Sequence, residues 1–317
     1  MSAIISTTST TGEATVVLGR RGSDVRGTVF RLALIASVVI SIAILGALIF
    51  EMVAEGDAVL TTRLWEFVTT GLKSNPEVAG VWQGIRGTVT LGVIVALVAF
   101  PVGIGAAVYL EEYAGDSRFA RIVNVNIRNL AGVPSIVYGL LGLAVFVKLL
   151  GENGRGGLTG ARTVISGGLT LAVLVLPIVI ITTQEALRAV PGGLREGAYA
   201  LGATRWEVIR HTVLPASAPG ILTGTVLSLA RAAGEAAPLL VIGAVSGVFF
   251  AGGQDLYTQI FEGRFTALPM VIFSWSRLPA SRGWNELVGA ASVILVALVV
   301  IMNGFAVWLR NRFEQRW

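Results

Sequence analysis

Six long apolar runs constrain the fold of this chain more than any other feature of its sequence. They cover residues 29–50, 85–110, 130–150, 163–183, 218–250 and 287–309. About 20 apolar residues in a helix are enough to cross the hydrocarbon core of a bilayer. The runs therefore predict an all-α, polytopic membrane protein with six transmembrane helices. The fifth run is too long for one straight crossing, and Gly234 and Pro238 are expected to bend or break it.

The composition fits a chain that lies mostly in lipid. Of the 317 residues, 54% are hydrophobic and only 14% are charged, whereas a soluble domain carries about 25% charged residues. The lack of cysteine excludes thiol catalysis and cysteine-ligated zinc, and the single histidine, His211, gives no basis for a metal site. The net charge of +5 comes from arginines beside apolar runs, which indicates membrane headgroups rather than nucleic acid.

The distribution of charge predicts the domain organisation and the orientation. Residues 1–28 are expected to form a disordered cytoplasmic tail, because they begin with a polar, Ser/Thr-rich stretch, and residues 29–317 form one membrane domain without an internal repeat. The first connection is acidic, from Glu51 to Glu77. Arginines crowd the N-terminal flank, the second and fourth connections and the C-terminus. Both termini are therefore predicted to lie in the cytoplasm.

The segment 185–216, between the fourth and fifth runs, is predicted to be a helical hairpin rather than a slack loop. Apolar residues recur in it at steps of three and four, namely Leu194, Ala198, Leu201, Trp206, Ile209 and Val213. Gly202 is expected to cap or bend the chain between the two halves, and Pro215 to end the second half. Two interpretations stay open. The hairpin docks into a groove on another protein, or it lies on the lipid headgroups.

The same segment resembles the EAA coupling motif of ABC importer permeases. The match consists of Glu196, Gly197 and Ala198, then Gly202, then Leu214 and Pro215. Gly197 stands where the motif usually has Ala, and Thr212 where it usually has Ile. The stretches TLGVIVALVAFPVGIGAAVYLEEYA, NLAGVPSIVYGLLGL and ARAAGEAAPLL look like the phosphate-importer permeases of the PstA type. That family usually has Thr in place of Ala236.

The resemblance implies a type I ABC importer permease fold in a bacterial or archaeal cytoplasmic (inner) membrane. The partners it implies are a PstC-type sister permease, two copies of an ATPase subunit, and a periplasmic or lipid-anchored phosphate-binding protein. The hairpin would pass the motion of the ATPases to the membrane helices. The alternatives are a permease for another oxyanion, such as molybdate or sulfate, and a secondary transporter, which is expected to show internal symmetry.

Arg231 and Glu235 are the ionisable residues in the fifth run and are four positions apart. Arg231 lies about 20 Å along the predicted helix, where an arginine costs about 2.5–3.5 kcal/mol, so it is expected to point into the bundle. The pair is either a self-neutralised structural feature or an oxyanion site. In the second case Arg231 contacts the anion, and Glu235 orients Arg231 or accepts a hydrogen bond from the protonated oxygen of hydrogen phosphate. The family resemblance favours the oxyanion site.

Three polar residues of NLAGVPSIVYG are weaker candidates for contact with the substrate: Asn129, Ser135 and Tyr138. Packing between helices explains them equally well. The chain lacks the G-x-x-x-x-G-K-[ST] loop that cradles nucleotide phosphates, and the glycine-rich stretch 151–160 is expected to be an exposed turn. The chain is therefore predicted to be no enzyme and to bind no cofactor itself, with ATP and Mg²⁺ bound by a partner ATPase.

Overall fold

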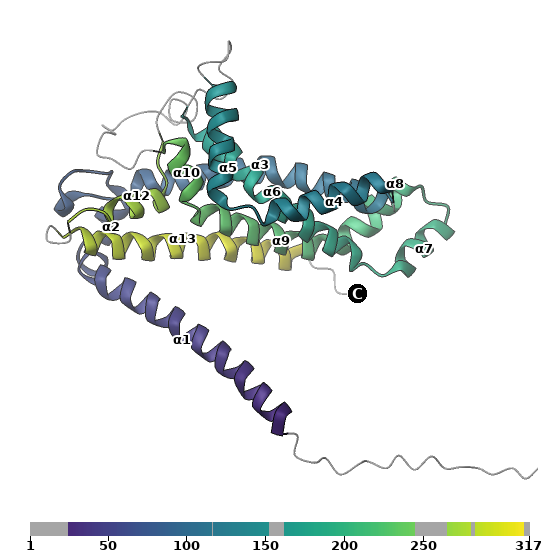
Figure 1. Ribbon diagram of the computed structural model, residues 1–317, viewed down its shortest axis with the longest axis horizontal. Coiled ribbons are helices and arrows are strands. Elements are labelled where there is room, and N and C mark those ends of the chain that lie inside the picture. The colour runs from purple at the N-terminus through teal and green to yellow at the C-terminus, as the bar shows by residue number, and fades with distance from the viewer. Residues whose placement is uncertain (1–24, 116, 152–161, 245–264, 280–282, 314–317) are drawn as a thin grey trace, which may run out of the picture. The chain divides into compact units, whose positions relative to one another are not determined.

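The computed structural model describes residues 25–115, 117–151, 162–244, 265–279 and 283–313, and every regular element in these ranges is a helix (Figure 1). The chain divides into two units, Met1–Ile49 and Phe50–Trp317. In the first unit the described residues 25–49 form the first part of α1 (Val25–Thr62), and all of them are exposed. Most of the predicted tail lies outside the described residues, and residues 25–28 belong to α1.

Helix α1 is longer than its apolar run. Glu51, Glu55 and Asp57, expected in a loop, lie on this helix instead. No proline interrupts residues 51–62, and Val59 is buried with Leu287 in a cluster that joins the end of α1 to α13 (Trp284–Phe313). Burial of Val59 therefore keeps the chain helical beyond the expected end. The short helices α2 (Leu64–Thr69) and η1 (Pro76–Val78, a 3₁₀ helix) follow.

The second unit is built around α6 (Val164–Arg188), which confirms the fourth predicted span. It packs against α3 (Trp82–Val108) and α9 (Leu214–Gly234), and α9 in turn packs against α13. Figure 1 shows α3, α6, α9 and α13 running along one common direction. Thr163 begins α6 with a capping box, in which its side chain and that of Ser166 accept hydrogen bonds from each other's backbone N–H groups. Helix α6 is apolar on all sides, and such a helix is stable when it is buried.

The third predicted span, 130–150, is not one straight helix. The chain forms α4 (Arg118–Ala131) and α5 (Ser135–Gly142), which continues as a π-helical segment to Leu149 (η3, Leu143–Leu149). The two parts meet at 103°. Pro134 lacks a backbone donor and disfavours helical geometry at Val133, so the helix ends before it. Leu130 and Ala131, predicted to begin the span, therefore belong to α4.

The fifth run breaks where it was expected to break. Helix α9 ends at Gly234, Glu235 has extended backbone angles of φ −82° and ψ 115°, and α10 (Ala237–Ile242) follows with Pro238 in its first turn. Residues 245–250 of this predicted span lie outside the described part of the chain. Within the part of the chain that the structure describes, five helices are long and apolar enough to cross a membrane, or six if the bent pair α4–α5 counts as one span, as predicted.

Pro215 does not end the second half of the hairpin, contrary to the prediction. Helix α8 (Arg205–Val208), the π-helical turn η4 (Ile209–Val213) and α9 form one helix of 30 residues, Arg205–Gly234. Pro215 lies in the first turn of α9, directly after the π-helical turn. The wider turn accommodates a residue that has no backbone N–H, so the helix continues. A further helix, α12 (Leu268–Trp275), is too short to be detected as an apolar run of membrane-spanning length.

Candidate functional site

Arg231 and Glu235 form an ion pair at the end of α9. Arg231 lies in the last turn of the helix and Glu235 is the first residue beyond it. The Nε atom of Arg231 and the Oε1 atom of Glu235 are 3.4 Å apart. Strong bonds between a guanidinium and a carboxylate measure about 2.7–2.9 Å, so this pair is loosely held.

The Arg231 side chain does not point into the bundle of this chain. It is 44% exposed and the Glu235 side chain is 20% exposed, whereas the neighbouring Ala232 and Ala233 are buried. The expectation of an interior position is therefore not met within the single chain. An arginine at this depth is costly in lipid, so a polar space or another protein chain is the environment that this face requires.

The α4–α5 corner lies close to the helix break at Glu235. Helix α5 packs against α10, and a Cβ atom added at Gly139 would lie only 2.8 Å from Cα of Pro238, so the approach requires glycine. Val133 and Tyr138 belong to the same apolar cluster as Ala232 and Ala236. The structure thus brings Tyr138 into the neighbourhood of the charged pair.

The three weaker candidates have different surroundings. Tyr138 is buried, and its hydroxyl donates a hydrogen bond of 2.8 Å to the carbonyl oxygen of Leu130, across the α4–α5 corner. Ser135 is half-buried and begins α5, where the backbone N–H groups of the first turn have no partner within the helix. Asn129 is exposed on α4, before the corner. These contacts favour packing for Tyr138 and decide nothing for Ser135 and Asn129.

The coupling segment is a compact hairpin. Its first helix is α7 (Gly192–Ala200), and its second begins at Arg205, where Thr204 and Glu207 form a capping box. Gly202 has a φ of +85°, a left-handed conformation that residues with a Cβ atom rarely adopt. The bend predicted at Gly202 is therefore present.

The apolar residues of the hairpin serve two different surfaces. Ile209 and Val213 are buried in a cluster with Leu187, and Ala198 and Leu214 pack against it. Four other side chains are exposed, and we call them the hairpin surface: Leu194 (37%), Tyr199 (45%), Leu201 (90%) and Trp206 (54%). Glu196 and Gly197 are exposed beside them, and Pro215 is half-buried at the start of α9. An exposed group of large apolar side chains is typical of a docking surface.

Arginine–glutamate contacts, which we call the hairpin latch, tie the hairpin to the π-helical turn η2 (Tyr109–Tyr113) that follows α3. Arg195 donates to the Oε1 atom of Glu112 at 3.0 Å and to the carbonyl oxygens of Leu187 and Val190 at 2.8 Å. Arg205 donates to the carbonyl oxygen of Glu112 and lies 4.9 Å from the ring centre of Tyr113. Arg188 and Glu111 form an exposed pair at 2.8 Å.

Sequence reasoning missed the latch. It used the arginines of segment 185–216 as a signal of orientation and as support for a hairpin that lies on the lipid headgroups. The available signal was the acidic pair Glu111–Glu112 at the end of the second apolar run. Its charge is opposite to that of the hairpin, and both segments were expected on the same side of the membrane. Opposite charges placed in this way predict contact, but not which residues pair.

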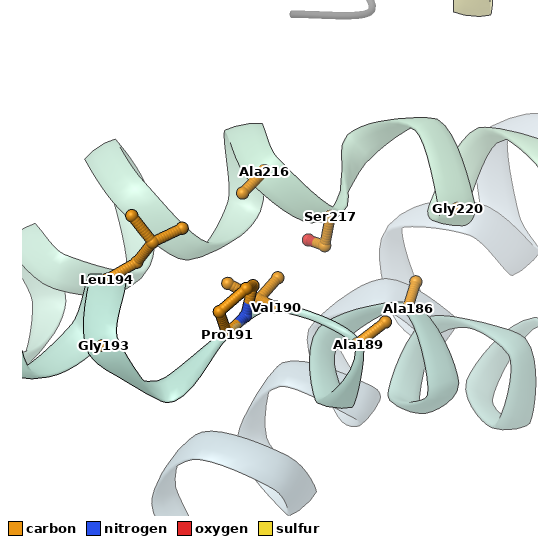
Figure 2. Close-up of a pocket in the computed structure, with 9 residues that line it drawn as sticks. All are labelled: Ala186, Ala189, Val190, Pro191, Gly193, Leu194, Ala216, Ser217 and Gly220. Carbon is orange, nitrogen blue, oxygen red and sulfur yellow. The ribbon is translucent and has the colours of Figure 1, made fainter. Parts of the chain in front are cut away.

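An apolar groove separates the start of α7 from the first turns of α9. Figure 2 shows that the groove lies between the end of α6, the start of α7 and the first turns of α9. Its volume is about 580 Å³, and small residues such as Ala186, Ala216 and Gly220 line much of it. The start of α7 is therefore held by the hairpin latch and the Leu187 cluster rather than by dense packing against α9.

The chain was compared with known protein families, proteins and structures. Residues 99–317 match the family described as binding-protein-dependent transport system inner membrane component. Phosphate transport system permease protein PstA 1 of Mycobacterium tuberculosis (strain CDC 1551 / Oshkosh) is 32% identical, over 84% of this chain and 82% of that protein. PstA of Mycobacterium leprae is 35% identical (78% and 75% covered), and PstA of Haemophilus influenzae is 32% identical (85% and 88% covered).

Solved structures share the fold. A bacterial alginate ABC transporter, in complex with an alginate-bound periplasmic protein, has a TM-score of 0.60 at 16% identity, over 90% of this chain and 95% of that chain. The inward-facing MetNI methionine ABC transporter has a TM-score of 0.55 at 18% identity, over 80% and 99% of the two chains. The predicted fold, that of a type I ABC importer permease, is confirmed. By these matches the chain belongs to the family of binding-protein-dependent transport system inner membrane components, among the PstA-type permeases.

Proposed function

We propose that the chain is the permease subunit of an ATP-driven phosphate importer and forms half of its translocation pathway. The observation that carries the proposal is the loosely held Arg231–Glu235 pair, which is exposed on the chain's own surface at a helix break. The relatives named as phosphate transport permeases support phosphate as the substrate. Another oxyanion, such as molybdate or sulfate, is the second candidate and is separated by competition below.

In the proposed mechanism Arg231 contacts the passing anion. Its guanidinium presents paired donors that match phosphate oxygens, and it stays charged at every relevant pH. Glu235 weakens the local positive field, so the anion binds without being trapped. Its carboxylate also accepts a hydrogen bond from the protonated oxygen of hydrogen phosphate, a donor that sulfate lacks. Ser135 and Asn129 are secondary candidates for contact with the anion, whereas Tyr138 supports the corner between α4 and α5.

The proposed partners supply the parts of an importer that this chain does not provide. Arg231 faces outward, so we propose that a PstC-type sister permease supplies the other half of the pathway. Two ATPase subunits would bind ATP and Mg²⁺ and dock on the hairpin surface. A periplasmic or lipid-anchored phosphate-binding protein would deliver the substrate. We place the complex in the bacterial or archaeal cytoplasmic membrane, with both termini of this chain in the cytoplasm.

Each matching residue of the coupling motif has a distinct role in this proposal. Glu196 and Gly197 are exposed and face the ATPase. Ala198 and Leu214 join the two sides of the hairpin through the Leu187 cluster. Gly202 allows the left-handed bend, and Pro215 follows the π-helical turn that leads into α9.

The test is ATP-dependent phosphate uptake by the complete complex in proteoliposomes. Arg231→Gln and Glu235→Gln are expected to reduce uptake by about tenfold or more, because each removes a charge-assisted interaction of roughly 1.5–3 kcal/mol. Both variants should still assemble with the partners. Arg312→Gln, an exposed arginine on α13, serves as the control and should transport normally. Sulfate should compete poorly with the natural chain and better with Glu235→Gln. Normal uptake by both site variants contradicts the proposal.

A further inference from the structure

We propose that the chain carries a second oxyanion site, which binds a phosphate group in a groove between α4 and the C-terminal end of α6. The groove has a volume of about 270 Å³. Its lining includes Ser117, Arg121, Asn124 and Arg128, which belong to α4 and its N-cap, and Arg188 of α6. Because α6 leads directly into α7, the groove is on the hairpin side of the membrane helices. The choice of phosphate as the ligand rests on the proposed function.

Three exposed arginines from two helices line this groove. Arg121 and Arg128 are seven residues apart, which places them on the same face of α4 two turns apart. Among the described residues, no carboxylate lies within ion-pair distance of either. Arg188 pairs with Glu111, and Glu185 also acts on it electrostatically. The lining therefore has a net positive charge, concentrated on the α4 side.

Neutral groups of the groove add hydrogen-bond donors. The buried Gln184 donates through Nε2 to the Oδ1 atom of Asn124 at 2.8 Å. With this oxygen accepting from Gln184, the amide nitrogen of Asn124 is the donor that it can present to an anion. Gly115, the buried Ala120 and Val125 complete the wall. Guanidinium forks combined with an amide donor suit the tetrahedral oxygens of a phosphate.

Arginines beside a bilayer are common on its cytoplasmic side, and this alone accounts for a positive surface. It does not account for two helices converging on one groove with an amide donor between them. The phosphate group has two sources, inorganic phosphate in solution and the headgroup of an anionic lipid. An anion in the groove would also compete with Glu111 for Arg188, next to the hairpin latch.

The experiment measures binding without transport. The complete permease–ATPase complex, carrying Arg231→Gln to weaken the pathway site, is placed in phosphatidylcholine nanodiscs without nucleotide or binding protein. Equilibrium dialysis with radiolabelled inorganic phosphate then compares Arg121→Gln/Arg128→Gln with Arg118→Gln. Arg118 is an exposed arginine of the same helix outside the groove. A second arm uses nanodiscs that contain phosphatidylglycerol, and native mass spectrometry measures how much of this lipid stays bound.

The double variant is expected to bind inorganic phosphate at least about tenfold more weakly than Arg118→Gln. Loss of retained phosphatidylglycerol, without a change in phosphate binding, supports the site with a lipid headgroup as its occupant. Equal phosphate binding and equal lipid retention in the two variants overturn the inference. Failure of the proposed function would appear in a different measurement, as normal phosphate uptake by the Arg231→Gln and Glu235→Gln variants.

Discussion

At the scale of single residues, the contacts separate side chains that the sequence presents as equivalent. Tyr138 and Arg231 were both predicted from the sequence as candidates for contact with the substrate. Tyr138 is buried and uses its hydroxyl to satisfy the carbonyl oxygen of Leu130, which fits a role in holding the α4–α5 corner. Arg231 is exposed and its partner is 3.4 Å away. An exposed residue with a weakly held partner is the better candidate for exchanging that partner with an anion.

Two glycines of the hairpin give opposite expectations for the same substitution. Gly202→Ala places a Cβ atom at a φ of +85°, which costs roughly 1–2 kcal/mol. Gly197→Ala meets open space within a helix, where alanine is favoured by up to about 1 kcal/mol. Gly202→Ala should therefore weaken co-purification of the ATPase and lower uptake, and Gly197→Ala should preserve both. Equal behaviour of the two variants in these assays contradicts the role given to the bend.

The charged pair was predictable from the sequence because ionisable residues are rare in apolar runs. The exposure of the Arg231 side chain was not predictable in this way. An arginine at i and a glutamate at i+4 suggest two residues on one helix face, but Glu235 lies outside the helix. The direction of the Arg231 side chain depends on which face of α9 the rest of the chain covers, and this is a property of tertiary packing.

At the scale of elements, the hairpin latch is the contact that fixes the hairpin to the membrane helices. Arg195 satisfies two carbonyl oxygens at the end of α6 and also pairs with Glu112, whose side chain is only 10% exposed. One side chain thus joins η2, the end of α6 and α7. Movement of α7 without η2 requires this partly buried pair to separate.

Arg195→Gln is expected to destabilise the complex by about 2–3 kcal/mol, less than the 3–5 kcal/mol typical of fully buried pairs. Arg188→Gln breaks an exposed pair and should cost at most about 1 kcal/mol. Thermal unfolding measures both values, and a double-mutant cycle with Glu112→Gln isolates the pairwise coupling. If the latch also positions the hairpin, Arg195→Gln lowers the phosphate imported per ATP hydrolysed. A parallel fall of uptake and hydrolysis would reduce the latch to a purely structural contact.

Periodicity and apolar length predicted most of the elements, and local chemistry explains the exceptions. The α4–α5 break follows from Pro134, a signal present in the sequence but outweighed by the continuous apolar run around it. At Pro215 the sequence predicted a helix end that the structure does not have. The π-helical turn before it accommodates a proline inside a helix. Proline marks a point of adjustment, and the surrounding contacts decide whether the helix ends there.

At the scale of the whole molecule, the number of crossings depends on the bent pair α4–α5. If it crosses the membrane once, three crossings separate residue 74 from residue 200, and the two lie on opposite sides. If the bent pair instead enters the membrane and leaves it on the same side, residues 74 and 200 lie on the same side of the membrane. Because the chain has no cysteine, Ser74→Cys and Ala200→Cys each introduce a single thiol at an exposed position.

A membrane-impermeant maleimide is expected to label Ser74→Cys in intact cells and Ala200→Cys only in inverted vesicles. The cysteine-free chain serves as the control for labelling of other proteins. Labelling of both positions from the outside, or of both from the inside, would contradict a six-crossing topology. It would also remove the reason for placing the hairpin surface next to an ATPase.

The continuous helix Arg205–Gly234 has a consequence for how the two ends of this protein communicate. Its first residue belongs to the hairpin and its last turn holds Arg231, while Glu235 sits just past its end. The helix is about 45 Å long, and it contains a π-helical turn and two prolines near its hairpin end. In the proposed mechanism, a tilt of its last turns moves Arg231, whereas Glu235 lies beyond the helix end, so the separation of the two charges changes. A movement of the hairpin that is transmitted to these turns would then reach a bound phosphate as a change in electric field.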